Sequence, residues 1–275
     1  MLDRLVNIFF LFSLVFIFIL SATAEDHLRI TLALALALAS AFIAFILNWL
    51  TLDGFTSAVL FGLIAYGLGG LLGAVVVLAF FISSSLLSKD MISEESLLDK
   101  KFRRDGLQVW SNGFWFTLWI IIWFLSKEEA FLIAGIASMA FATADTWASE
   151  VGGHRVKGKT WLVTNFQTVK PGTDGGISLV GTLASLVGAF FIGTLFWFIE
   201  PVSGVKSFFL VSLAGFIGSF IDSWLGAKFQ GRMLHKRLKD IFARQITYVD
   251  NNLVNWLASG SSSTIALLTF LILGH

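Results

Sequence analysis

The sequence contains no cysteine, which excludes disulfides, thiol chemistry and cysteine-based metal sites. Its histidines are few and none lies at ligand spacing from another, so zinc is not expected; they are His27, His154, His235 and His275. Proline occurs twice, and charged residues make up 13% of the chain, against about 25% in soluble proteins. What the chain does have is 56% hydrophobic residues, including 29 Phe and 10 Trp. This composition predicts an all-α, polytopic membrane protein.

Long apolar runs set the number of predicted spans, because a transmembrane helix needs about 20 such residues. The shorter run 54–67 is either a short span or a re-entrant segment, so the prediction is eight or nine transmembrane helices. The clear runs are 5–23, 30–50, 68–88, 110–126, 130–149, 177–199, 207–228 and 253–273.

The first run has two readings. "IFFLFSLVFIFIL" followed by "SATAED" resembles a signal peptide with a small-residue cleavage site. The positive charge before it is weak, because Asp3 offsets Arg4, and this favours an uncleaved anchor. We therefore divide the chain into an N-terminal hydrophobic segment, 1–29, and an integral-membrane catalytic domain, 30–275.

Basic residues indicate the orientation. Of the 19 Lys and Arg, most lie in the loops 89–109, 150–176 and 228–252, and an even number of spans separates each loop from the next. The positive-inside rule places these loops in the cytoplasm and the C-terminus outside. The net charge of +1 gives no indication of a nucleic-acid partner.

A short unit recurs in the second half of the chain. "ADTWASEVGG" from Ala144 and "IDSWLGAKF" from Ile221 each place Asp, then Ser or Thr, then Trp in an apolar run. Each run follows a helix expected to start on polar and glycine residues, "SNG" at 111–113 and "GTDGG" at 172–176. These features predict a parallel internal repeat, with "LDG" at 52–54 as the start of a degenerate third copy.

The repeat gathers opposite charges at the cytoplasmic face. Helix N-termini with glycine bind anions, whereas Asp145, Glu150 and Asp222 lie at helix C-terminal ends, where a carboxylate needs a cation. Mg²⁺ would satisfy them, since it takes one or two carboxylates plus substrate phosphates. The alternative for each Asp is an ordinary ion pair with a neighbouring Lys or a place in the headgroup zone. Trp147 and Trp224 are expected in the interfacial belt.

One phosphate-binding pattern is discounted. "GHRVKGKT", residues 153–160, fits G-x-x-x-x-G-K-T, but a true P-loop needs a strand before it and a helix after it. Here a predicted transmembrane helix precedes the pattern.

Four segments together resemble one family: "RRDGLQVWSNG" (103–113), "ATADTWASEVG" (142–152), "TNFQTVKPGTDGGISLVGTLAS" (164–185) and "GSFIDSWLGAKFQ" (218–230). It is the integral-membrane family that includes plant phytyl-phosphate kinase and animal transmembrane protein 19. The resemblance runs from about residue 30 to the C-terminus. It implies a kinase that transfers the γ-phosphoryl group of a nucleoside triphosphate, CTP being the expected one, to an isoprenoid monophosphate lipid.

The resemblance and the chemistry together suggest site residues. Asp145, Asp222 and Glu150 would hold Mg²⁺, and Lys170, Arg104 and Arg103 would neutralise phosphates. Asn112 and Asn165 would bind nucleotide or lipid phosphate, with Asp105 and Gln108 supporting them. The helix start that cradles phosphate would comprise Gly172, Thr173, Asp174, Gly175 and Gly176.

Other classes remain open at this stage. Intramembrane carboxylates and glycine-broken helices also occur in transporters, and a lipid-phosphate flippase needs only a hydrophilic groove. A nucleotidyl or phosphatidyl transferase would use the same metal and lipid phosphate. The sequence leaves open whether the chain forms a homo-oligomer.

Overall fold

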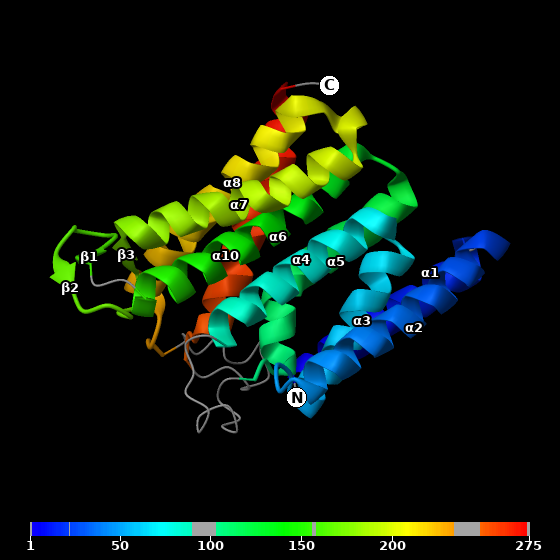
Figure 1. Ribbon diagram of the computed structural model, residues 1–275. Coiled ribbons are helices and arrows are strands. Elements are labelled where there is room, and N and C mark those ends of the chain that lie inside the picture. The colour runs from blue at the N-terminus through cyan, green and yellow to red at the C-terminus, as the bar shows by residue number, and fades with distance from the viewer. Residues whose placement is uncertain (1, 22, 90–102, 156–157, 234–247, 274–275) are drawn as a thin grey trace.

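The computed structural model describes residues 2–21, 23–89, 103–155, 158–233 and 248–273, and it confirms a helical membrane protein (Figure 1). Within these residues, seven helices are long and apolar enough to cross a membrane. They are α2 (Ala24–Ile46), α4 (Gly70–Lys89), α5 (Gly106–Ser126), α6 (Glu129–Glu150), α7 (Leu179–Ile199), α8 (Gly204–Phe229) and α10 (Asn251–Leu273).

Two further helices lie beside these seven. α3 (Leu52–Gly67) is the short run whose role the sequence left open. It is one continuous helix: its first turn packs on Arg104, and the carbonyl of Gly67 accepts a 2.9 Å bond from Arg29 Nε at the other end of the bundle. A re-entrant hairpin is therefore excluded.

The other helix, α1 (Leu2–Ser21), packs against α3 and α5. Phe10 is fully buried and stacks on Trp110, with ring centroids 4.9 Å apart. Trp110 also donates a 2.7 Å hydrogen bond to Asn7 Oδ1. Residues 29 and 30, between which the sequence analysis divides the chain, both lie in α2.

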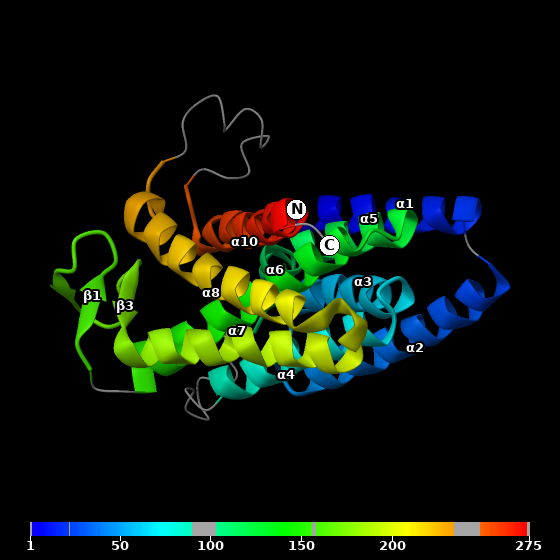
Figure 2. The same cartoon turned by 90° about the horizontal axis from the view of Figure 1, so that it is seen from above.

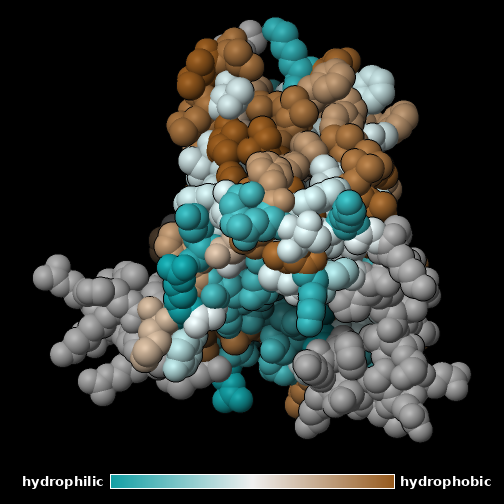
Figure 3. Space-filling model, turned by 90° about the vertical axis from the view of Figure 1, so that its left-hand side faces the viewer, coloured by the Kyte–Doolittle hydropathy of each residue, from teal (hydrophilic) through white to brown (hydrophobic). Residues whose placement is uncertain are grey.

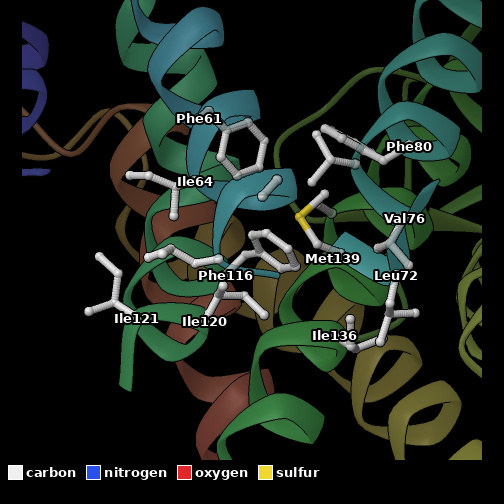
Figure 4. Close-up of a cluster of buried hydrophobic side chains, with 14 of the residues drawn as sticks. Phe61, Ile64, Leu72, Val76, Phe80, Phe116, Ile120, Ile121, Ile136 and Met139 are labelled. Carbon is white, nitrogen blue, oxygen red and sulfur yellow. The ribbon is translucent and has the colours of Figure 1, made fainter. Parts of the chain in front are cut away.

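The helix α6 is central and packs against α4, α5, α7, α8 and α10 (Figure 2). Small residues allow this close approach, as is common between membrane helices. A Cβ at Gly215 of α8 would lie 2.6 Å from the Ala140 Cβ of α6. Ser262 of α10 donates to the carbonyl of Ala214 at 2.9 Å. Along the other side of α6, aliphatic and aromatic side chains of α3, α4 and α5 fill the core (Figure 4).

Connections gather at two ends. At one end of the bundle, which we call the loop end, α4, α6 and α8 finish and α5, α7 and α10 begin. We call the opposite end the turn end. At the turn end, α5 and α6 are joined by Lys127–Glu128, and α7 and α8 by a short 3-10 turn, Pro201–Ser203. The hairpins α5–α6 and α7–α8 thus point the same way, each with its Asp on the returning helix. Figure 3 shows the face of the molecule that lies on the left in Figure 1. This face is hydrophilic in its lower part and largely hydrophobic above.

A small antiparallel sheet lies at the loop end. Its strands are β1 (Thr160–Leu162), β2 (Thr168–Val169) and β3 (Gly176–Ser178), in the order β2-β1-β3. Only β3 leads directly into a helix, α7, whose N-cap is Ser178.

The P-loop-like pattern has the reverse context of a true P-loop. Gly153 belongs to a π-helical extension of α6 (Val151–Arg155), and Thr160 opens β1. A helix therefore precedes the pattern and a strand follows it, and Lys157 lies outside the described residues.

Candidate functional site

A polar cavity of about 280 Å³ opens among α6, α7, α8 and the sheet at the loop end. Carboxylates, hydroxyls and glycine backbone line it, including Asp145 from α6, Asp222 from α8 and the loop 172–176. The two halves of the predicted repeat therefore meet at one cavity.

Asp145 and Asp222 are the central pair. Their carboxyl groups lie within hydrogen-bonding reach of each other, and both residues are partly buried. Two carboxylates at such a distance repel each other unless a proton or a cation is shared between them. Asp145 reaches this position near the end of α6, and Asp222 lies two turns before the end of α8.

A third helix contributes to the pair. The amide of Asn255, in α10, is oriented with its nitrogen toward two acceptors and donates to Asp222 Oδ1 at 2.9 Å and to the Asn251 carbonyl at 3.2 Å. Asn255 is buried, so this bond fixes the position of one carboxylate oxygen of Asp222. Sequence reasoning missed Asn255, although an Asn inside the apolar run 253–273 was a signal for a functional polar group.

The loop 172–176 forms one wall of the cavity, and it is not the helix start that the sequence suggested. α7 begins three residues after Gly176, behind β3. The loop instead packs its backbone on α8: Gly175 has φ +73°, and a Cβ there would lie 2.5 Å from the Ser223 carbonyl. Gly172 is also left-handed, with φ +81°. Glycine is required here so that the backbone can approach α8.

Asp174 is turned toward the pair and anchored by a second residue. Gln230 Nε2 donates to Asp174 Oδ1 at 2.9 Å, and Asp174 acts electrostatically on Asp222. Thr173, its neighbour, donates its hydroxyl to the Lys170 carbonyl at 2.7 Å. These bonds hold the exposed loop in shape above the carboxylate pair.

The donor set fits a magnesium ion bound partly by substrate. Among the described residues, no group of three or more His, Cys, Asp or Glu side chains is arranged to hold a metal. Asp145 and Asp222 supply two carboxylates, which is the protein share that Mg²⁺ takes when phosphate oxygens and water complete its shell. Glycine N–H groups beside them suit a phosphate chain.

Glu150 does not join this pair, contrary to the predicted metal set. Its Oε1 accepts a 2.6 Å hydrogen bond from Ser88 of α4, and its charge acts on Arg104. Five residues after Asp145, it points about 140° away around the helix. Trp147, near the same helix end, donates to Ser83 Oγ at 3.2 Å and stacks on Phe191.

Arg104 and Asn112 line a second cavity, of about 150 Å³, between α2, α3, α4 and α5. Arg104 Nη1 and Asn112 Oδ1 are enclosed there without hydrogen-bond partners. Burial lowers the pKa of Arg104 to about 10, although the charge of Glu150 opposes that shift, so the guanidinium stays charged at neutral pH. Arg103 lines neither cavity, and its Nε is enclosed without a partner.

The remaining predicted residues have structural positions. Asn165 Oδ1 accepts from the Gln167 N–H at 3.1 Å at the turn between β1 and β2, and Lys170 is exposed outside the cavity lining. Asp105 and Gln108 form a capping box at the start of α5. The sequence "SNG" consequently lies inside α5, more than a turn after its start.

Comparison with known proteins identifies the family. The family model described as "Integral membrane protein DUF92" matches residues 35–263. The chain belongs to this family. A membrane protein of Methanocaldococcus jannaschii is 34% identical over 65% of this chain and 74% of its own length.

Two Arabidopsis thaliana proteins are also similar to this DUF92 protein. The chloroplastic protein VTE6 is 26% identical over 81% of this chain and 66% of its own length. Protein PGR is 29% identical over 69% of this chain and 75% of its own length. No solved structure matches the chain.

Proposed function

We propose that this DUF92 protein is a membrane kinase that transfers the γ-phosphoryl group of a nucleoside triphosphate to an isoprenoid monophosphate, giving the diphosphate. The observation that carries the proposal is the meeting of Asp145 and Asp222 beside a glycine-lined, phosphate-compatible loop. Similarity to VTE6 and the resemblance to the phytyl-phosphate kinase family support the reaction class. CTP is the expected donor.

The acceptor is already a phosphate oxygen, so the reaction needs no strong base. One acceptor oxygen would form a bond to the γ-phosphorus while the bond to the β-phosphate oxygen breaks, releasing the nucleoside diphosphate. Positioning and charge neutralisation dominate such a transfer. Magnesium, when bound, would neutralise phosphate charge between the two anions.

Each residue has a proposed task. Asp145 and Asp222 would hold the metal, and Asn255 would orient Asp222. The N–H groups of Gly172, Asp174 and Gly175 would bind the donor phosphates, because those of Thr173 and Gly176 already donate to backbone carbonyls. The orientation follows from the basic loops, which favour a cytoplasmic active face in the cell or inner membrane and an external C-terminus.

The test uses purified protein in detergent with Mg²⁺, geranylgeranyl monophosphate, and γ-labelled CTP or ATP in parallel. We expect label in the prenyl diphosphate, and its loss in Asp145→Asn and Asp222→Asn. A nucleotide-linked lipid with free pyrophosphate would instead identify a nucleotidyl transferase. No transfer by folded protein with any nucleotide would overturn the kinase proposal and favour a lipid-phosphate carrier.

A further inference from the structure

The second cavity is largely apolar, and its charge lies at one end. Small residues of α2 and α3 form much of its wall, among them Ala33, Ala37 and Ala41 on one helix and Ala58 and Gly62 on the other. Its charged and amide side chains lie at the loop end, where Arg104, Gln108 and Asn112 approach, and the hydroxyl residues Ser40 and Tyr66 lie elsewhere in the wall. A hydrocarbon chain and an anionic head would match this distribution.

Its width suits one chain. An apolar cavity of about 150 Å³ accepts a group of roughly benzene size, and this cavity has that volume. Leu36 and Leu78, which line it from α2 and α4, are 55% and 40% exposed on the membrane-facing surface. A chain can therefore enter sideways from the bilayer and extend back into it, whereas a two-chain phospholipid does not fit inside.

The charged end is built rather than incidental. The backbone of Arg104 is held by two bonds, from its N–H to the Trp49 carbonyl at 2.9 Å and from the Thr51 N–H to its own carbonyl at 3.1 Å. Its guanidinium lies 5.4 Å from the ring centres of both Phe80 and Phe81. Nη1 is enclosed with no hydrogen-bond partner. A buried cationic N–H without a partner is costly, and an anionic oxygen would satisfy it.

We propose that the groove between α2 and α4, floored by α3, binds a single-chain lipid phosphate with its phosphate on Arg104 and its chain along the wall that Ala37 and Ala41 form. The proposal rests on the proposed function only in taking this lipid to be the kinase's acceptor. Glu150 relates the positions of the two cavities: its charge acts on Arg104, and it ends α6 about 7.5 Å along the axis from Asp145. The phosphate would thus be held at the same end of the bundle as the carboxylate pair.

The experiment measures binding of geranylgeranyl monophosphate, without nucleotide, to protein in phosphatidylcholine nanodiscs. Ala37→Phe fills the groove, and Ala39→Phe is the matched control because Ala39 faces outward on the same helix. If the new ring keeps about two CH₂ groups of the lipid chain out of the groove, binding should be roughly tenfold weaker for Ala37→Phe. Binding should not change for Ala39→Phe. Arg104→Gln is the second variant, which keeps the test decisive if Ala37→Phe fails to fold.

The inference would be overturned if Ala37→Phe and Arg104→Gln both bound the lipid as strongly as wild type does, or if Ala39→Phe weakened binding as much as Ala37→Phe does. It would also be overturned if two-chain phosphatidic acid competed for the site as strongly as the single-chain lipid. Failure of the lipid-site inference can be distinguished from failure of the kinase proposal. Groove-dependent binding without phosphoryl transfer would support the lipid site alone. Transfer whose acceptor KM is the same in Ala37→Phe and wild type would support the kinase alone.

Discussion

At the scale of single residues, the structure separates carboxylates that look alike in the sequence. Asp145 and Glu150 both end the same helix, but only Asp145 faces Asp222. Among the described residues, no cationic side chain is bonded to either carboxylate of the Asp145–Asp222 pair. Its mutual repulsion is therefore the property that a bound metal would relieve.

We expect Mg²⁺ to stabilise the wild-type protein, because a ligand that binds only the folded state at 100 times its Kd adds about 2.7 kcal/mol. Asp145→Asn and Asp222→Asn should lose this thermal shift. Glu150→Gln is the matched control and should retain it, since Glu150 bonds Ser88 instead. A melting curve with and without Mg²⁺ measures the difference; loss of the shift in Glu150→Gln would place the metal elsewhere.

Asn255→Ala should lower the rate of phosphoryl transfer by roughly tenfold, the scale typical of groups that orient metal ligands. The reason is the bond that Asn255 donates to Asp222. Asn252→Ala, three residues earlier on α10 and outside the cavity lining, should leave the rate unchanged. Equal rates for wild type and Asn255→Ala, in folded protein, would contradict this role.

At the scale of elements, the loop 172–176 owes its position to glycine. Gly175 combines a left-handed backbone with contact to Ser223 and Ala227 of α8, and no other residue type allows both. The sequence showed the glycines but not their use, because β3 separates them from α7.

Gly175→Ala should displace this loop from α8 and abolish most of the transfer activity. An alanine in the left-handed region also costs about 1–2 kcal/mol of stability. Gly158→Ala is the matched control, since a Cβ there meets nothing within 4 Å and should change neither quantity. Activity assays and denaturation of both variants give the comparison; wild-type activity in Gly175→Ala would show that the loop position is not needed.

At the scale of the whole molecule, the loop end and the turn end are expected on opposite sides of the membrane. Because the chain has no cysteine, a single introduced thiol can report the side on which each end lies. Glu128→Cys at the turn end and Gly158→Cys at the loop end place single thiols at exposed positions. In intact cells, a membrane-impermeant maleimide should label Glu128→Cys and should label Gly158→Cys only after permeabilisation. The opposite pattern would place the carboxylate cavity outside the cytoplasm.

The sequence alone determined the class of protein, its spans and its recurring Asp residues, because hydrophobic length and helix-end composition are local properties. It also indicated that Asp145 and Asp222 share one face. Only the tertiary structure decided which groups meet: Asn255 joins Asp222 from the far end of the chain, Glu150 turns to Arg104, and Arg104 lines a separate apolar groove. The physical reason is that the rotation of each helix, and so the direction of its polar side chains, is set by the close packing of small residues around α6.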